Sequence, residues 1–158
     1  MVLDAQKARV VSLEADGSAR PLADNLVFAN GITLLENGTV VIAETRAERL
    51  TLKSTDGYTA SIPAPGAPDN LSAIGDRVIA ALIPNLLTFA LYRYGFLDAA
   101  PSHIAAWDQQ TGWQSLYEDQ NGTQFSGVTV GVMPRNDILI AGSIQDAGVL
   151  VCQTGGLS

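Results

Sequence analysis

Apolar and polar positions alternate over short stretches along most of this chain, and turn-forming residues separate the stretches. Residues 30–44 contain two such stretches that meet at Asn37-Gly38, and residues 69–81 and 126–142 repeat the arrangement. Alternation over about four to eight residues, broken by Gly, Asn or Asp, predicts β-hairpins. Because the unit returns at intervals of roughly 40 to 60 residues, the pattern predicts a β-propeller or a related array of sheets.

A second kind of hairpin alternates with the first. Its turns lie at Asp16-Gly17, at Asp56-Gly57 and within residues 107–112, between apolar stretches. Asp-Gly pairs favour positive backbone φ angles and therefore tight reversals between strands. Two alternating hairpins make one four-stranded unit, which is the blade of a propeller.

The positions of the turns predict where each blade begins and ends along the chain. We expect the outer strands of a partial blade in residues 8–14 and 19–23, a full blade in residues 29–63, a second, interrupted blade in residues 69–82 and 103–117, and three strands of a last blade in residues 126–153. The predicted fold class is therefore all-β, a half-propeller with about 13 strands in about three blades. Residues 1–158 are predicted to form this half-propeller as a single domain.

Three blades do not close a ring, because propellers typically have about four to eight. An arc of three blades leaves sheet edges that can pair with another chain. The chain is then either a part of a larger ring or one half of a homodimer that completes six blades. In such a dimer, the N-terminal strands would supply the missing outer strand of the partner's last blade, with one strand left over.

Residues 83–102 interrupt the second blade with an apolar segment. The run from Leu86 to Leu97 follows Asn85, which suits the start of a short helix that ends near Gly95. Three interpretations remain open: a packing insertion between strands, a lid over the channel mouth, and a dimer contact. The segment is too short to cross a membrane.

Composition narrows the classes of function. Of 158 residues, 47% are hydrophobic and 16% are charged, so the chain can bury a core. The formal net charge of -7 argues against nucleic-acid binding, which needs clustered Lys and Arg. The single cysteine, Cys152, forms no intrachain disulfide and stands in an apolar run typical of a buried strand. With no visible signal peptide and no apolar run of about 20 residues, we expect a cytoplasmic location without a membrane span.

Three polar residues stand at the start of predicted inner strands. Asn30 begins the first of these strands, and Asp69 and Asn70 begin the next. Because inner strands of neighbouring blades converge around the axis, a carboxylate and amide oxygens would meet there. Such hard oxygen ligands suit calcium better than zinc, which prefers His or Cys. The alternative interpretation is that these residues only form turns.

Five segments of the chain resemble one known superfamily. They are Phe28–Thr33, Val41–Thr45, Pro68–Leu71, Gly127–Thr129 and Leu139–Ser143. Together they are similar to the senescence marker protein/gluconolactonase and strictosidine synthase-like superfamily, which resembles the paraoxonases. The resemblance covers nearly the whole chain, but only the C-terminal half of the six-bladed propeller of that superfamily.

The resemblance implies a divalent metal ion, usually calcium, in the central channel. It implies that Asn30 and Asp69 are metal ligands, that Asp69 is also the catalytic base, and that Asn70 completes an Asp-Asn pair. The implied reaction is hydrolysis of a small lactone or ester, with the metal polarising the carbonyl. A glutamate ligand and another asparagine of the family's front half have no counterpart here. A two-fold pair of chains would bring two copies of each candidate ligand around one axis.

Further candidates follow the strands at the channel mouth. Glu44 and Arg46 are candidate substrate-binding residues, or they form an exposed ion pair. His103, the only histidine, opens a predicted strand and is either catalytic or structural. No serine stands in a nucleophile-elbow pattern, and no glycine loop for phosphate is present.

Two functions of different classes follow from these observations. The first is a metal-dependent lactonase or esterase, active as a dimer that completes the ring. The second is a binding or assembly module that has kept the blades and lost the chemistry, which the missing front half favours. A truncated product with no role of its own is a third alternative.

Overall fold

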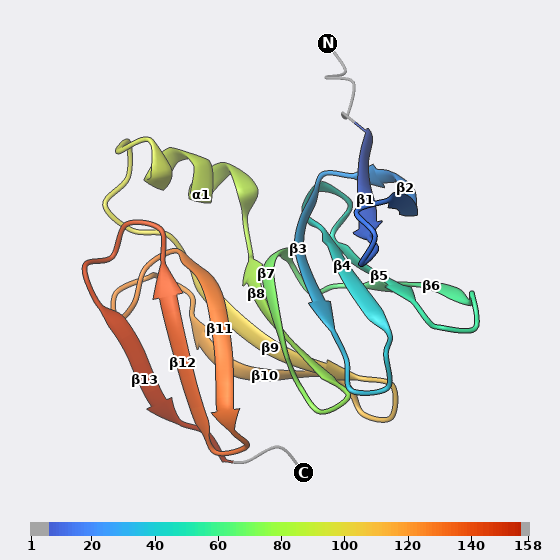
Figure 1. The fold of residues 1–158 in the computed structure, drawn as a ribbon. Coiled ribbons are helices and arrows are strands. Elements are labelled where there is room, and N and C mark those ends of the chain that lie inside the picture. Colours follow the sequence, from blue (N-terminus) through green and yellow to red (C-terminus); the bar gives the residue numbers. More distant parts are fainter. Residues whose placement is uncertain (1–6, 156–158) are drawn as a thin grey trace.

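The computed structural model describes residues 7–155, which contain thirteen strands and one α-helix (Figure 1). The strands are β1 Lys7–Leu13, β2 Ala19–Val27, β3 Ala29–Leu34, β4 Val40–Glu44, β5 Arg49–Lys53, β6 Thr59–Pro63, β7 Ala67–Ile74, β8 Arg77–Ile83, β9 Ser102–Asp108, β10 Gly112–Asp119, β11 Val128–Arg135, β12 Ile138–Ser143 and β13 Val149–Gln153. The helix is α1 Leu86–Arg93, and a short 3-10 turn, η1, covers Thr45–Ala47. The predicted single domain, residues 1–158, extends beyond the described residues at both ends.

The strands form four antiparallel sheets in the order of the sequence. β1 and β2 pair alone, β3 to β6 and β7 to β10 form two four-stranded sheets, and β11 to β13 form a three-stranded sheet. Within each sheet every strand pairs with the next along the chain, so each sheet is a meander (Figure 1). The predicted all-β class, with two full blades flanked by two incomplete ones, is confirmed.

The turns between strands have the chemistry that the sequence predicts. At the β3–β4 hairpin, Gly38 has a φ of 84°, and its N–H donates to the Leu35 carbonyl at 3.0 Å. The Asn37 side chain accepts a hydrogen bond from the Thr39 N–H at 2.9 Å. Because a side chain is strained at this positive φ, the glycine determines where the chain reverses.

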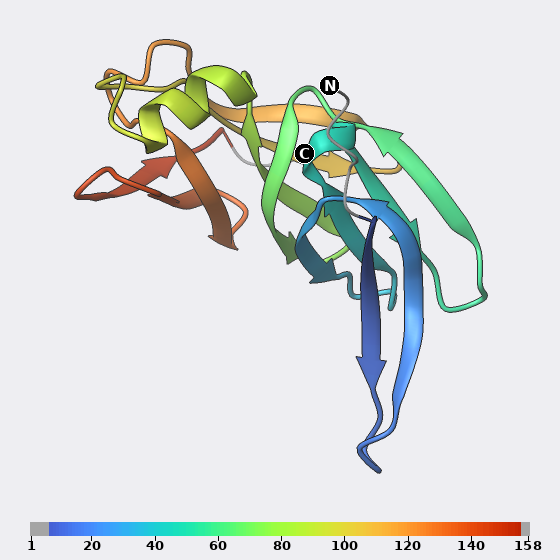
Figure 2. The same ribbon diagram turned by 90° about the horizontal axis from the view of Figure 1, so that it is seen from above.

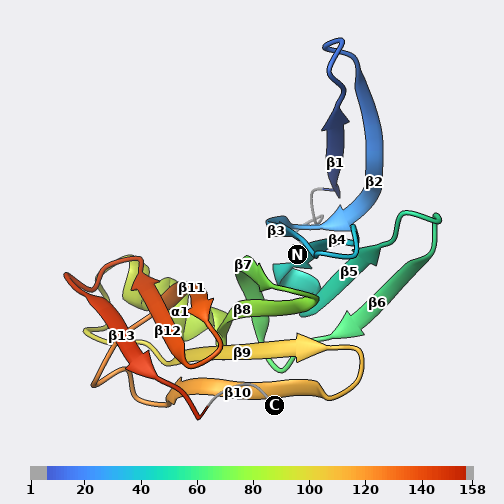
Figure 3. The same cartoon turned by 60° about the horizontal axis from the view of Figure 1, so that its bottom comes forward.

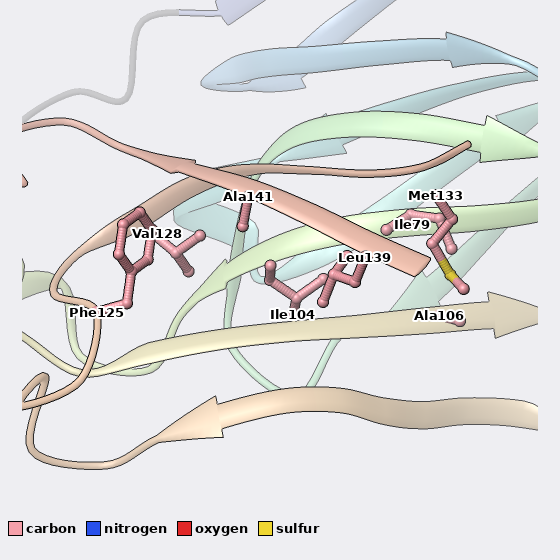
Figure 4. Packing of buried hydrophobic residues seen from close by; sticks show 8 residues of the cluster. All are labelled: Ile79, Ile104, Ala106, Phe125, Val128, Met133, Leu139 and Ala141. Carbon is pink, nitrogen blue, oxygen red and sulfur yellow. The ribbon is translucent and has the colours of Figure 1, made fainter. Parts of the chain in front are cut away.

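The core lies between successive sheets and is divided into three main layers. One cluster, around Leu26 and Ile42, joins the β1–β2 hairpin to the next sheet. A second cluster, around Leu50 and Trp107, joins the two four-stranded sheets. Figure 4 shows the third cluster, between the last two sheets: Ile79, Ile104, Ala106, Phe125, Val128, Met133, Leu139 and Ala141. Face-to-face packing of successive sheets is the arrangement of propeller blades.

Residues 40–43 of β4 and 78–83 of β8 are continuous apolar runs because both faces of these strands are buried. Val41 packs toward the following sheet, whereas the adjacent Ile42 packs toward the preceding hairpin. In β8, Val78 and Ile79 divide between the second and third clusters in the same way. Successive side chains of a strand point to opposite faces, so one strand contributes to two interfaces.

The first strands of the last three sheets, β3, β7 and β11, lie side by side. The Ser72 hydroxyl on β7 donates to the Gly131 carbonyl on β11 at 2.7 Å. β3 approaches β7 so closely that a Cβ on Gly31 would collide with the backbone oxygen of Asp69. One face of this row is open, since Ile32 on β3 is 51% exposed. These strands are the inner strands that the sequence predicts around the channel.

α1 confirms the helix predicted within residues 83–102. Asn85 caps the first turn by accepting a hydrogen bond from a backbone N–H at 2.9 Å. Gly95, with a φ of 76°, follows the last turn at the predicted place. Phe89 and Tyr92 are buried and hold the helix against the sheets. No helix in residues 7–155 is long and apolar enough to cross a membrane.

The two ends of the array leave strands with an unpaired edge. Figures 2 and 3 show the β1–β2 hairpin extending away from the other sheets. At the other end, β13 pairs only with β12, and its residues Val149 and Val151 are 66% and 62% exposed. Cys152 lies on this strand, as predicted, and is half-buried rather than fully buried. The edges expected of an incomplete ring are therefore present.

Candidate functional site

A cavity of about 550 Å³ lies beside α1, where inner strands of neighbouring sheets begin. Its lining residues are Phe28, Asn30, Thr45, Arg46, Ile83, Leu86, Phe89, Ala90, Arg93, Tyr94, Thr129 and Ile144, together with Asp69 and Asn70. All three candidate metal ligands predicted from the sequence are among them. The fold therefore brings Asn30, Asp69 and Asn70 into one place.

Asn30 and Asp69 are in direct contact. Asn30 Nδ2 on β3 donates to Asp69 Oδ1 on β7 at 2.6 Å. Asp69 is only 8% exposed, whereas Asn30 is exposed. The two strands can approach to this distance because Gly31 carries no Cβ. The second carboxylate oxygen, Asp69 Oδ2, accepts no hydrogen bond from residues 7–155.

Irregularities in strand pairing set the direction of these side chains. The register shifts in β3 between Ala29 and Ile32, in β7 between Pro68 and Leu71, and in β11 between Val128 and Val130. The residues within these shifts include Asn30, Asp69 and Thr129. A β-bulge bends a strand and redirects a side chain, and bulges are over-represented beside functional sites. Three inner strands are thus irregular at the level of the cavity.

The pKa of Asp69 is raised above the usual range of aspartate because the carboxyl group is buried. The hydrogen bond from Asn30 and the positive charge of Arg93 act in the opposite direction without cancelling the effect of burial. A carboxylate with a raised pKa is a stronger base in its ionised form, which suits a general base.

Asn70 follows Asp69 in sequence and contacts the neighbouring strand on the other side. Its Nδ2 donates to the Thr129 carbonyl at 2.9 Å and so links β7 to β11. The amide oxygens of Asn70 and Asn30 accept no hydrogen bond within the described part of the chain. Both oxygens are therefore available to a ligand in the cavity.

The donor set has the chemistry of a calcium site but not the full number of ligands. Asp69 offers one free carboxylate oxygen, and Asn30 and Asn70 offer amide oxygens, whereas calcium takes about six to eight oxygens. Among the described residues, no group of three or more His, Cys, Asp or Glu side chains could hold a metal ion. Arg46 and Arg93 also line the cavity and repel a cation. The residues present fit part of a metal site, and the other ligands would have to come from outside residues 7–155.

η1 places Arg46 on the wall of the cavity. The buried Thr45 fixes this turn, because its N–H donates to the Phe28 carbonyl at 3.2 Å and its hydroxyl donates to the Pro68 carbonyl at 2.7 Å. The Arg46 guanidinium lies 5.1 Å from the centre of the Phe28 ring, a cation–π contact. Phe28 has a φ of 57°, a strained left-handed conformation for an aromatic residue. The strained residue therefore lies where the Phe28 ring and the Arg46 guanidinium line the cavity.

Glu44 does not line the cavity, contrary to the expectation from the sequence. Its side chain is fully buried, and Arg49 Nε and Nη2 donate to it at 2.8 Å and 3.0 Å. Thr51 Oγ1 and the Val27 N–H each donate at 2.6 Å. Burial alone would raise the pKa of Glu44, but these hydrogen bonds and the charge of Arg49 outweigh it, so the pKa is lowered. The expected placement of Glu44 at the channel mouth, and its exposed ion pair with Arg46, are therefore corrected: Glu44 is buried and forms an ion pair with the half-buried Arg49.

His103 lies on β9, away from the cavity. Its Nε2 is 3.1 Å from Ser115 Oγ on the neighbouring strand β10. Burial lowers the pKa of His103, which favours the neutral ring. This placement agrees with the structural interpretation of His103.

Sequence reasoning did not single out Arg93 and Tyr94, which also line the cavity. The sequence predicted the helix that precedes Tyr94, but it did not predict which face of that helix lies toward the inner strands. The Tyr92 ring packs so closely on Gly127 that a Cβ there would collide with it. This long-range contact orients α1, and no periodicity within residues 83–102 reveals it. α1 packs on the sheets and lines the cavity, so the packing interpretation holds, whereas the lid over the channel mouth and the dimer contact stay predictions.

A larger hollow, of about 930 Å³, lies at the opposite ends of the inner strands and is lined largely by turn residues. Its acidic groups are paired: Arg77 Nε donates to Asp108 Oδ2 at 3.0 Å, and Asp76 accepts from the Asn37 N–H at 2.8 Å. Hydrogen bonds, first of all from Thr111, lower the pKa of Asp108 to about 2. Both acids are engaged in hydrogen bonds within the described part of the chain, so the smaller cavity is the better candidate site.

Comparison with known proteins identifies the class of fold. Neither a family model nor a curated protein matches the sequence. Solved structures of β-propellers, however, match nearly the whole chain. The predicted half-propeller is thereby confirmed.

Three of these structures illustrate the likeness. An inferred gluconolactonase has a TM-score of 0.60 at 14% identity, over 95% of this chain and 47% of that one. The calcium-binding protein regucalcin from Agrobacterium tumefaciens has a TM-score of 0.53 at 13% identity, over 90% and 50%. Virginiamycin B lyase from Staphylococcus aureus has a TM-score of 0.54 at 12% identity, over 92% and 48%. The chain thus spans about half the length of these structures, and at these identities the likeness concerns the fold alone.

Proposed function

We propose that this chain supplies half of the site of a calcium-dependent hydrolase that cleaves a small lactone or ester. The observation that carries the proposal is the contact between Asn30 and the buried Asp69, with Asn70 beside them, in one cavity at the inner strands. The names of two structural neighbours, an inferred gluconolactonase and a calcium-binding regucalcin, support the same class of activity.

The chain's own residues would divide the chemistry as follows. Asn30 holds Asp69 Oδ1, which leaves Oδ2 to take a proton from the attacking water. That water adds to the acyl carbon, the bond to the leaving oxygen breaks, and the proton passes from Asp69 to the leaving alkoxide. The oxygens of Asn30, Asp69 and Asn70 would hold the ion, which when bound supplies Lewis-acid polarisation of the carbonyl.

A second copy of the chain is the partner that we propose for the missing half. The three oxygens of one chain are too few for calcium, and a two-fold pair doubles them. The outward face of the inner strands exposes Ile32 (51%), Leu34 (63%) and Val130 (36%), which a second half-ring would cover. The unpaired β13 and the projecting β1–β2 hairpin provide edges for strand pairing between copies. Residues 7–155 of each chain contain one strand more than three four-stranded blades hold, so one strand stays outside the ring.

Sedimentation equilibrium tests the homodimer. We expect a native mass twice that of one chain, and a shift to the monomer in Leu34→Asp, because burying an unpaired charge in the interface is unfavourable. Tyr58→Asp is the control, since Tyr58 is 67% exposed in the β5–β6 turn. A monomeric wild-type protein would rule out the dimer.

Calcium titration followed by thermal melting tests the metal site. Binding to the native state alone raises the melting midpoint, and at a hundredfold excess over Kd the gain is about 2.7 kcal/mol. We expect this shift in the wild type, its loss in Asp69→Ala, and its retention in Asp98→Ala, an exposed aspartate outside the cavity. Hydrolysis of lactones and aryl esters should stop when EDTA removes the ion. A shift that Asp69→Ala leaves intact would remove Asp69 from the site.

A non-catalytic β-propeller module for binding or assembly is the second candidate. The specific observation that favours it is the incomplete ligand set, with two arginines in the cavity where a cation would bind. Turnover of a panel of small lactones and aryl esters separates the two candidates, since metal-dependent hydrolysis excludes the module. The cytoplasmic location and the single domain over residues 1–158 stay predictions of the sequence.

A further inference from the structure

The cavity beside α1 has a charge opposite to that of the whole chain. The formal net charge of the chain is -7, yet the charged residues that line this cavity are Arg46, Arg93 and Asp69. Neither arginine forms an ion pair with a carboxylate in residues 7–155. An electropositive concave site in an acidic protein focuses its field on a small region and concentrates anions there.

Both arginines extend from backbone that is held in place. Arg46 follows Thr45, whose hydrogen bonds to the Phe28 and Pro68 carbonyls fix η1. Arg93 ends α1, and its carbonyl accepts from Gln145 Nε2 at 2.6 Å. The two cations therefore line the cavity from two different anchored elements, η1 and α1, rather than from loose loops.

One part of the cavity wall is apolar. Leu86 and Phe89 of α1 and Ile144, which follows β12, line it beside the two arginines. Leu86 and Ile144 are 37% and 39% exposed, so their apolar surface is open to a ligand. A ligand that fits this wall combines an anionic group with an apolar body.

We propose that this cavity binds an apolar carboxylate, with its acid group between Arg46 and Arg93 and its apolar part against Leu86, Phe89 and Ile144. Guanidinium groups match the planar carboxylate and bind it with paired hydrogen bonds. If the bound carboxylate is part of the substrate, a lactone or ester that carries an acid group, the inference rests on the proposed function. The binding of a carboxylate in this cavity does not depend on hydrolysis.

Calorimetric titration with hexanoate and hexanamide tests the site, because the two probes share their apolar chain and differ in charge. We expect hexanoate to bind at least about tenfold more tightly than hexanamide at low salt. Arg46→Gln and Arg93→Gln should each raise the Kd of hexanoate about tenfold and leave that of hexanamide within about twofold. Arg135→Gln is the matched control, because Arg135 is exposed, pairs with Asp137 at 3.3 Å and lies outside the cavity.

Several outcomes would overturn the site: equal affinity for the two probes, a Kd of hexanoate unchanged in both cavity variants, or an equal loss in Arg135→Gln. Hydrolysis of 4-nitrophenyl hydrogen glutarate and of neutral 4-nitrophenyl pentanoate separates this inference from the proposed function. Selective hexanoate binding without hydrolysis of either ester would support the site and reject the hydrolase. Hydrolysis of both esters at equal rates, without hexanoate binding, would support the hydrolase and reject the site.

Discussion

Glu44 and Asp69 are buried carboxylates in neighbouring sheets, and their surroundings differ in one respect that decides their chemistry. Glu44 accepts four hydrogen bonds, two of them from Arg49, whereas Asp69 accepts one, from Asn30, within residues 7–155. The pKa of Glu44 is consequently lowered and that of Asp69 is raised. The comparison teaches that burial does not by itself mark a functional carboxylate. The number of donors around it separates a structural acid from a candidate base.

Strand register explains why the two acids differ. Glu44 stands directly opposite Arg49 in the regular β4–β5 ladder, so its partner is delivered by the sheet itself. Asp69 stands within the register shift of β7, where pairing with β8 is interrupted. A regular ladder therefore surrounds Glu44 with donors, while the irregular one leaves Asp69 Oδ2 open to the cavity.

The largest effect that we expect is on turnover in Asp69→Asn. Loss of a general base lowers kcat/KM by about a thousandfold, within the range typical of such groups. Stability should change by no more than about 1 kcal/mol, because only one hydrogen bond is altered. Steady-state kinetics and urea unfolding measure the two quantities. A destabilisation as large as that of Glu44→Gln, with activity retained, would break the distinction between the two acids.

Glu44→Gln should show the reverse behaviour. Replacing the carboxylate leaves the guanidinium of Arg49 without its counter-charge, and because that side chain is 39% exposed we expect a loss of about 2 kcal/mol in the free energy of unfolding, less than for a fully buried pair. Urea denaturation measures it, with Glu36→Gln at an exposed turn as the control. If the variant were as stable as its control, Glu44 would not be the structural acid of the pair.

The pH dependence of stability should follow Glu44 in the acid range. Its folded pKa lies below the unfolded value of 4.5, so its contribution is fully present above pH 4.5 and is lost as the pH falls through the folded pKa. Urea midpoints between pH 3 and pH 7 should therefore drop more steeply below about pH 4.5 in the wild type than in Glu44→Gln. Parallel curves for the two proteins would contradict this assignment.

The smallest effect concerns a single donor to Glu44. Thr51→Val keeps the shape of the side chain and removes the hydroxyl that donates to Glu44 at 2.6 Å. We expect a loss of about 1 kcal/mol, typical of one hydrogen bond, and a Glu44 pKa that rises toward its usual range. Unfolding and NMR titration provide the readouts, and Thr123→Val, at an exposed position, should change neither.

Much of the fold followed from the sequence because turn chemistry is local. Glycine and Asn or Asp at fixed places, such as Asn37-Gly38, placed the hairpins, and the contact of Asn30 with Asp69 agreed with neighbouring inner strands. The partner of Glu44 was missed because Arg46 is nearer in sequence, although an antiparallel hairpin after Glu44 places Arg49 opposite it. The sequence therefore contained enough information to predict the pairing of Glu44 with Arg49.

Other parts of the site could not follow from local patterns. Arg93 reaches the cavity only because α1 docks through Tyr92 on the backbone of Gly127, a contact between distant segments. The bulge at Asp69 depends on how β7 pairs with β8, and no residue within Pro68–Leu71 indicates it. Long-range packing, rather than composition, determined these features.

The division of the core into separate clusters between successive sheets has a consequence for the dynamics of the molecule. Each sheet is stabilised mainly by its immediate neighbours, so opening can begin at either end without disturbing the centre. Amide hydrogen exchange should therefore be fastest in β1, β2 and β13 and slowest in β4 and β8, whose two faces are both covered. The candidate ligands Asn30 and Asp69 lie on β3 and β7, beside these slowly exchanging strands, so local opening at the ends would leave the spacing between the two side chains intact.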